Sequence, residues 1–256
     1  MNLGDASSRT TATDGRPRDP VAEVIARLEV SARKGERWLT GYAKSKLRQD
    51  PIYRTVLPLI PPRMKVLDLG CGVGLLGLLL DARGLENEIH GIEWDAPKTR
   101  FAQRLTEQIP SIQLVCGDLW EESWPQCSMV VLLDVLHYFP PDQQRRLLFR
   151  IGSHLPEGGR LLLRVMDARS GGVAMLTRLC EWGAVKFGWN QAPGVHWRPL
   201  AAIRGDLLEA GFSILPSPGK ADHGLGNCLL VCGKPRSADP LPARSPSGLR
   251  RSSRSS

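Results

Sequence analysis

Acidic residues stand at the ends of four apolar, strand-like runs in this chain of 256 residues. Asp68 lies in "KVLDLGCGVG" and Glu93 ends "IHGIE". Asp118 follows "VCG", and Asp134 ends "VVLLD". The carboxyl ends of parallel strands meet at one edge of a sheet and bind ligands there, so four carboxylates at that edge favour a positively charged ligand. Any one of them alone could be a helix cap or a turn residue, so the prediction rests on the four together.

The glycine-rich segment after the first of these runs narrows the choice of ligand. Gly70, Gly72 and Gly74 allow a ligand to approach the backbone closely. A phosphate-binding loop of the form GxxxxGK[ST] is excluded because the required lysine is missing. The dinucleotide pattern GxGxxG is present at residues 72–77, which leaves an NAD-dependent oxidoreductase as an alternative. Asp68, however, would repel a pyrophosphate.

The run "VLDLGCGVG" and the acidic strand ends resemble class I S-adenosylmethionine-dependent methyltransferases over about residues 56–233. The resemblance implies that the glycine backbone approaches the methionyl part of S-adenosyl-L-methionine. It also implies that Glu93 accepts the ribose hydroxyls, that Asp118 binds the adenine amino group and that Asp134 faces the methyl group. The implied cofactor-binding residues are Asp68, Gly70, Cys71, Gly72, Gly74, Glu93, Trp94, Asp118, Leu119 and Asp134.

Histidines after the fourth strand and in a later insertion are the candidate catalytic residues. His137 is the first candidate for a general base and His196 the second, because imidazole titrates in the useful range. Packing near the cofactor is an equally open role for His137. Further residues that could orient or meet an acceptor are Tyr42, Tyr53, Tyr138, Arg164 and Arg169. The six cysteines show no metal-ligand spacing, so no metal site is predicted.

Alternation of apolar runs with amphipathic stretches predicts an α/β fold. We expect a doubly wound, seven-stranded, mostly parallel sheet that ends in an antiparallel C-terminal hairpin. The predicted strands are Lys65–Leu69, Glu88–Glu93, Ile112–Cys116, Met129–Asp134, Arg160–Val165, Phe212–Leu215 and Cys228–Cys232. The predicted helices between them are Leu75–Ala82, Pro97–Gln108, Asp142–His154 and Pro199–Ala210.

Composition divides the chain into one domain and two tails. Residues 1–19 and 235–256 are expected to be disordered, and the second tail is basic. Residues 20–234 are expected to form a single methyltransferase domain. Within it, residues 20–60 would form a helical cap and residues 167–197 an insertion of the length typical of a lid. No apolar run is long enough to span a bilayer and the N-terminus lacks a signal sequence, so we expect a cytoplasmic protein.

The acceptor is expected to be a small molecule. The sequence "DVLHYFPPD" lacks the [DNS]PP[YFW] pattern of nucleic-acid amino methyltransferases, although the net charge of +8 keeps RNA methylation open. A non-catalytic scaffold is a further alternative. The segment from Tyr42 to Leu80 is similar to methyltransferases of bacterial aryl-polyene and xanthomonadin-type clusters. That similarity implies an aromatic or phenolic acceptor, or a polyene or lipid intermediate on an acidic acyl carrier protein.

Overall fold

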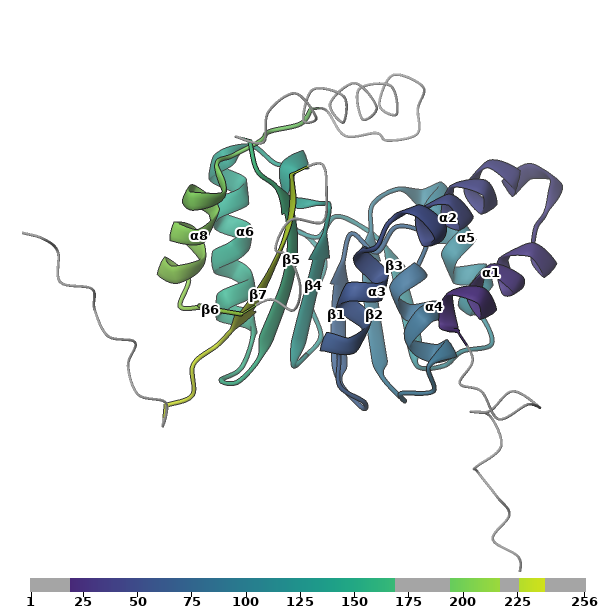
Figure 1. Cartoon of the computed structure of the whole chain (residues 1–256), viewed down its shortest axis with the longest axis horizontal. Helices are drawn as coiled ribbons and strands as arrows, with labels where there is room; N and C mark the ends of the chain where they lie inside the picture. Colours follow the sequence, from purple (N-terminus) through teal and green to yellow (C-terminus); the bar gives the residue numbers. More distant parts are fainter. Residues whose placement is uncertain (1–18, 169–193, 217–225, 238–256) are drawn as a thin grey trace, which may run out of the picture.

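The computed structural model of the protein describes residues 19–168, 194–216 and 226–237 (Figure 1). These residues build a seven-stranded sheet with the strand order β3-β2-β1-β4-β5-β7-β6. The strands are β1 Lys65–Leu69, β2 Glu88–Glu93, β3 Ile112–Cys116, β4 Met129–Leu133, β5 Arg160–Met166, β6 Ser213–Leu215 and β7 Asn227–Gly233. β7 runs antiparallel to β5 and β6, and the other pairings are parallel. The predicted fold class is confirmed.

Helices cover both faces of the sheet (Figure 1). The α-helices are α1 Pro20–Val30, α2 Arg37–Gln49, α3 Ile52–Val56, α4 Leu75–Ala82, α5 Ala96–Thr106, α6 Pro141–His154 and α8 Leu200–Glu209. Short 3-10 turns are η1 Lys34–Glu36, η2 Leu57–Leu59 and η3 Leu136–Tyr138. One hydrophobic core joins the sheet to α1 through α5, and a second joins the opposite face to α6 and α8.

Alternation along β4 explains why its sequence is apolar throughout. Met129 and Val131 belong to the first core, whereas Val130 and Leu132 belong to the second. A strand covered on both faces needs an apolar side chain at every position. Burying each such side chain stabilises the fold by roughly 2 kcal/mol.

Strand order reverses at β1, which pairs with β2 on one side and with β4 on the other. Asp68 of β1 is in register with Gly91 of β2 and with Val131 of β4. From β2 the chain continues to β3 on one side of β1, and from β4 it continues to β5 on the other side. Where the strand order reverses in this way, the carboxyl edge of the sheet forms a crevice that can bind a ligand. The glycine-rich loop after β1 and the acidic residues at the strand ends lie at this edge of the sheet.

The segment before the sheet is helical between residues 20 and 60. In α2 the buried residues Leu39, Ala43 and Leu47 recur at helical spacing and form one face. α1 packs on α4, and α2 packs on α1. Most of the predicted lid and nearly all of both predicted disordered ends lie outside the described residues.

Candidate active site

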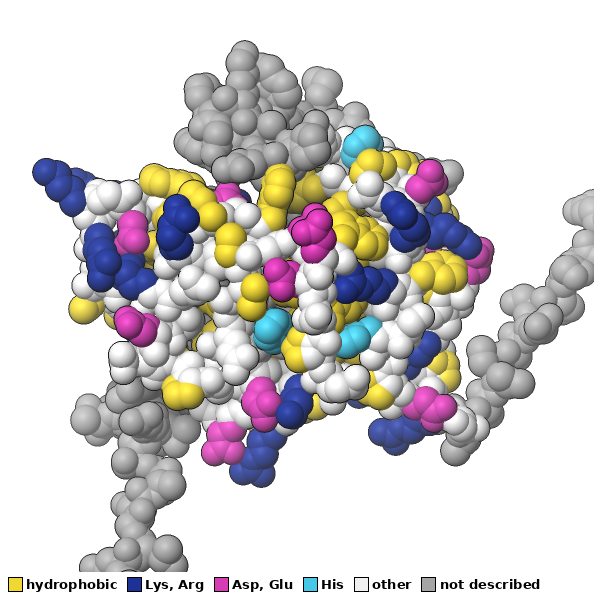
Figure 2. Space-filling view, turned by 180° about the vertical axis from the view of Figure 1, so that it is seen from behind, with side chains coloured by type: hydrophobic (Ala, Val, Ile, Leu, Met, Phe, Trp, Pro, Cys, Tyr) yellow, Lys and Arg dark blue, Asp and Glu magenta, His cyan; other side chains and the backbone are white. Residues whose placement is uncertain are grey.

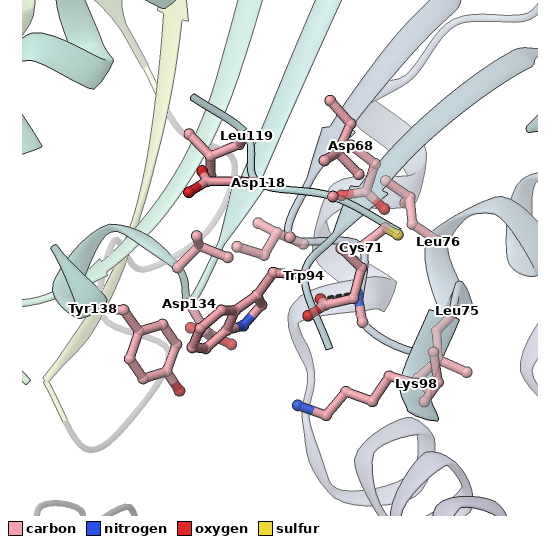
Figure 3. A pocket seen from close by; sticks show the side chains of 18 of the residues that line it. Asp68, Cys71, Leu75, Leu76, Trp94, Lys98, Asp118, Leu119, Asp134 and Tyr138 are labelled. Atoms are coloured by element: carbon pink, nitrogen blue, oxygen red, sulfur yellow. Dashed lines mark hydrogen bonds between the residues drawn. The ribbon is translucent and has the colours of Figure 1, made fainter. Parts of the chain in front are cut away.

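A cavity of about 520 Å³ opens at the carboxyl edge of β1, β2 and β4. All of the predicted cofactor residues except Gly74 line it. They are Asp68, Gly70, Cys71, Gly72, Glu93, Trp94, Asp118, Leu119 and Asp134. Figure 3 shows Asp68, Trp94 and Asp118 around the same hollow, with Tyr138 and Lys98 on opposite sides in that view. The structure therefore brings together side chains from four strand ends.

The loop between β1 and α4 depends on glycine for two separate reasons. Gly70 has a φ of 75°, and a Cβ placed on it would lie 2.3 Å from Cγ2 of Val135. Gly72 has a φ of 58°, but a Cβ there would meet no atom within 4 Å. Gly70 is thus required by packing, and Gly72 keeps the backbone open toward the cavity. Gly74, the residue just before α4, has a left-handed backbone conformation.

Glu93 ties this loop to the end of β2. Its two carboxylate oxygens accept hydrogen bonds from the backbone N–H of Gly72 at 2.8 Å and from that of Asp95 at 3.0 Å. Burial raises the pKa of Glu93, and the hydrogen bond from Asp95 and the charge of Lys98 oppose that rise. Glu93 therefore orders the loop and also presents a carboxylate to the cavity.

Asp68 is the most strongly perturbed carboxyl of the site. It is 5 % exposed and lines the cavity. Burial, followed by the negative charge of Glu93, raises its pKa to about 7, although Lys46 opposes the shift. A buried carboxyl in this state is poised for a cationic partner, because such a partner would stabilise the ionised form.

Asp118 and Trp94 line the cavity from the ends of β3 and β2. Asp118 accepts a hydrogen bond from the backbone N–H of Trp120 at 2.8 Å, so it also serves as the turn residue considered from sequence. The indole of Trp94 is 49 % exposed. An exposed aromatic ring beside a buried polar hollow offers a flat apolar surface to a heterocycle.

Asp134 belongs to a chain of partly buried ion pairs. Its Oδ2 atom lies 3.3 Å from Nζ of Lys46 and 3.1 Å from Nη1 of Arg164. The same Nη1 atom lies 2.6 Å from Oδ2 of Asp50. Burial alone would raise the pKa of Asp134, but Lys46 and Arg164 hold it below its usual value. Arg164 is buried and does not line the cavity, so its predicted contact with an anionic acceptor has no support here.

The two predicted catalytic histidines lie beside each other but not in the lining of the cavity. The backbone N–H of His196 donates to the carbonyl of His137 at 2.7 Å. The ring of His137 stacks on Trp197 with centroids 4.6 Å apart, and burial lowers its pKa to about 4. This position agrees with the packing role that the sequence left open, and a role as general base stays a prediction.

Several cavity residues were not predicted from sequence. Lys46 and Lys98 bring positive charge to the cavity, and Trp120, Phe139 and Gln143 extend its lining. A signal for Lys46 exists, since it follows Tyr42 by one helical turn on α2. All three tyrosines considered from sequence line the cavity, namely Tyr42, Tyr53 and Tyr138. Arg169 lies outside the described residues.

Within the described ranges, no group of three His, Cys, Asp or Glu side chains is arranged to hold a metal ion. The same part of the chain contains no helix that is both long and apolar enough to cross a membrane. Its cysteines are present as free thiols.

The cavity suits S-adenosyl-L-methionine in size and in chemistry. Its volume lies within the range of about 300–1,000 Å³ that holds small-molecule ligands. Open space beside Gly72 leaves room against the backbone, Asp68 suits a cationic amine, and Trp94 offers a surface for adenine.

Comparisons with known proteins agree with this geometry. A family model described as a methyltransferase domain matches residues 41–217. Curated carboxy-S-adenosyl-L-methionine synthases from Shewanella species, including strain ANA-3, are 28% identical over 109 residues. That match covers 41% of this chain and 45% of the relative, so the chain spans about half the length of the curated relatives it matches.

Solved structures show the same fold at low sequence identity. The pyocyanin biosynthetic protein PhzM is 16% identical with a TM-score of 0.58, and the match covers 82% of this chain and 61% of PhzM. Magnesium protoporphyrin IX methyltransferase from Synechocystis PCC 6803, with bound SAH, is 19% identical with a TM-score of 0.54 and coverages of 83% and 95%. The [4+2]-cyclase SpnF is 17% identical with a TM-score of 0.53 and coverages of 73% and 81%. The family match, which extends over more than half of the chain, shows that the protein belongs to the methyltransferase domain family, whose methyl donor is S-adenosyl-L-methionine.

Proposed function

We propose that this protein transfers a methyl group from S-adenosyl-L-methionine to a small-molecule acceptor. One observation carries the proposal: Asp68, Glu93 and Asp118, from three neighbouring strands, line a single cavity. Such a row of carboxylates suits a cationic nucleoside and opposes a pyrophosphate, so it favours this cofactor over NAD.

In this proposal the bound cofactor supplies an electrophilic methyl group on a sulfonium. Asp68 would neutralise the cationic amine, and Glu93 would hold the ribose while it orders the Gly72 loop. Trp94 and Leu119 would flank the adenine. The remaining task of the chain is to hold an acceptor atom in line with the methyl group and to exclude water.

For the acceptor we propose an aromatic or phenolic unit. Tyr42, Tyr138 and Phe139 line the cavity and provide rings for such a unit to pack on. Delivery on an acidic carrier protein is a further proposal that a basic protein surface would complement.

Nucleic acid is the less favoured partner. Figure 2 shows one face of the molecule, on which basic and acidic side chains are interspersed. Binding to a phosphate backbone calls instead for a continuous basic surface.

Cofactor binding is the first test. Isothermal titration calorimetry with S-adenosyl-L-homocysteine and with NAD should give heat of binding for the first alone. Asp68→Ala and Glu93→Ala should each weaken binding by about tenfold or more, since each removes a charged partner. Lys65→Ala, at the opposite end of β1, is a matched control with an exposed side chain. Unchanged affinity in both site variants would refute the assignment.

Catalysis needs a separate test, because the same fold also serves a cyclase. The protein is incubated with methyl-labelled cofactor and a panel of phenols or a cell extract. Transfer of label to a small molecule supports the proposed function. Tight cofactor binding with label that never leaves the cofactor would favour a scaffold.

A further inference from the structure

The helical cap contributes hydrogen-bond donors to the cavity, beside its carboxylates. These donors are Tyr42 and Lys46 from α2 and Tyr53 from α3. Tyr138 from η3 lines the same cavity. An ammonium and phenolic hydroxyls are hydrogen-bond donors, so the cap brings several donors to the cavity.

Lys46 is held beside the cavity by its pairing with Asp134. Its side chain is 22 % exposed, and one ion pair, of 3.3 Å to Oδ2 of Asp134, is formed within the described part of the chain. An ammonium has three N–H donors, so donors remain for a ligand. Asp134 is shared with Arg164, which lies outside the cavity lining and offsets part of the negative charge.

The charge of Lys46 is fixed at neutral pH. Burial alone would lower its pKa, but Tyr42 and Asp134 raise it well above the usual value. Burial also raises the pKa of Tyr53, which therefore keeps its proton. Lys46 and Tyr53 cannot act as bases at neutral pH, and both are able to donate hydrogen bonds to a negatively charged oxygen.

The described lining contains no histidine. Asp134 has a lowered pKa, which makes it a poor base, and the proposed function uses Asp68 and Glu93 to hold the cofactor. An acceptor that becomes anionic without help from a base fits such a site. A carboxylic acid does so fully near neutral pH, and an acidic phenol does so once a cation lowers its pKa.

We infer that the acceptor carries an oxyanion, either a carboxylate or a phenolate, and that Lys46 binds it with help from the tyrosine hydroxyls. This inference rests on the proposed function. In the transfer, the acceptor oxygen forms a bond to the methyl carbon while the methyl–sulfur bond breaks. The bonding pair stays on sulfur, so the sulfonium becomes a neutral thioether. A phenol would first lose its proton to water, and Lys46 would stabilise the phenolate.

A probe that reports its own ionisation tests this directly. 4-Nitrophenol is titrated with pH in the presence of the protein saturated with S-adenosyl-L-homocysteine, and the phenolate is followed by absorbance. The bound probe should ionise at a lower pH than the free probe. Lys46→Gln should abolish that shift, and Lys46→Arg should retain most of it because the charge is kept.

Lys44→Gln is the matched control. Lys44 lies on the same helix, pairs with Glu29 and does not line the cavity. This variant should leave the ionisation shift unchanged. A loss of the shift in Lys44→Gln equal to that in Lys46→Gln would overturn the inference, because general surface charge would then explain it.

A competition experiment distinguishes the two oxyanions. Benzoate and benzyl alcohol, which differ in charge, are titrated against bound 4-nitrophenol. Benzoate should displace the probe at a lower concentration than benzyl alcohol does. Lys46→Gln should weaken the affinity for benzoate by about tenfold to a hundredfold, which is the effect of losing a charge-assisted hydrogen bond. An ionisation shift without preference for benzoate assigns the site to phenolates alone.

Two outcomes separate failure of this inference from failure of the proposed function. If S-adenosyl-L-homocysteine does not bind the wild-type protein, the proposed function fails. If it binds equally to wild type and Lys46→Gln, but the protein binds neither 4-nitrophenol nor benzoate, the oxyanion site alone is refuted. Equal displacement by benzyl alcohol and benzoate, with no ionisation shift, refutes it as well.

Discussion

Asp68 favours binding of a cation when it is ionised, but its ionisation lowers the stability of the ligand-free protein. Its pKa is about 7 in the folded protein, whereas an aspartate in an unfolded chain titrates near about 4. The folded state therefore holds the proton more tightly, and it loses stability as the pH rises from about 4 to about 7. Above that range the buried charge costs stability until a cation binds beside it.

The first prediction concerns this cost. Asp68→Asn should raise the free energy of unfolding of the ligand-free protein at about pH 8 by at least about 1 kcal/mol, since one pKa unit corresponds to about 1.4 kcal/mol. The gain should shrink as the pH falls toward 5. Urea unfolding at several pH values measures it. A variant that is less stable than wild type at about pH 8 would contradict the cause given for the shift.

The second prediction concerns binding by the same residue. A cationic ligand binds the ionised form of Asp68, so affinity for S-adenosyl-L-homocysteine should fall by up to about tenfold for each pH unit below about 7. Above that pH the affinity should be level. Calorimetry across this range measures the slope. Asp68→Asn should remove the slope, and a slope that persists in the variant would point to another group.

At the scale of elements, the ion-pair chain fastens the cap to the sheet. Lys46 lies in α2, and Asp50 is the residue that ends α2. Asp134 follows β4, and Arg164 lies in β5. Removing Arg164 leaves the partly buried charge of Asp50 without its ion-pair partner. The cap, which carries the residues proposed to bind the acceptor, is therefore positioned by charge as well as by apolar packing.

The third prediction tests this fastening. Arg164→Met should destabilise the protein by about 3 kcal/mol, because Asp50 loses its ion-pair partner and Asp134 keeps only Lys46. Adding Asp50→Leu should cost less than the sum of the two single variants. Arg160→Met, at an exposed position of the same strand, is the control. Additive effects in thermal or urea unfolding would show that the pair is not coupled.

The fourth prediction contrasts two glycines of one loop. Gly70→Ala meets Val135 and a left-handed backbone, so it should destabilise the fold by more than the roughly 1–2 kcal/mol of the backbone alone. Gly72→Ala meets open space, so it should show the backbone cost alone and should also weaken cofactor binding. Val135→Ala should partly rescue Gly70→Ala and not Gly72→Ala. Equal rescue of both would contradict the assignment.

The sequence predicted the strands to within one residue at their ends because an acid or a glycine closes most of the apolar runs and a proline closes β6. β4 shows why the boundary slips: Asp134 was assigned to the strand, but its φ of 60° turns the chain out of it. Cavity residues on strand ends were found for the same reason. Lys46 was missed although its spacing from Tyr42 on α2 is a local signal. Its contact with Asp134 and the burial of Arg164 depend on how the cap meets the sheet, which no local pattern encodes.

At the scale of the whole molecule, the stacking of Trp197 on His137 was not predicted, because it too depends on residues that are far apart in the sequence. Position after the fourth strand suggested a base, but Trp197, sixty residues further on, stacks over the ring and keeps it out of the cavity lining. Only the folded chain brings these residues together. The fold class, by contrast, follows from repeated alternation and survives local errors.

The fifth prediction concerns the basic C-terminal residues. Removing residues 238–256, after the last described strand, should leave the thermal midpoint and the affinity for S-adenosyl-L-homocysteine unchanged, because their composition cannot build a core. Differential scanning calorimetry and titration of the truncated protein check this. A drop of several degrees would show that these residues stabilise the domain.

The position of β7 has a consequence for how the protein is made. β7 is the last strand of the described residues, yet it lies between β5 and β6. While the ribosome is still synthesising residues beyond 216, the apolar β5 has one neighbour, β4, and an open edge. Open apolar edges recruit strands from other chains. Early termination before Asn227 should therefore yield an aggregating product, and chaperone protection would be needed until Gly233 emerges.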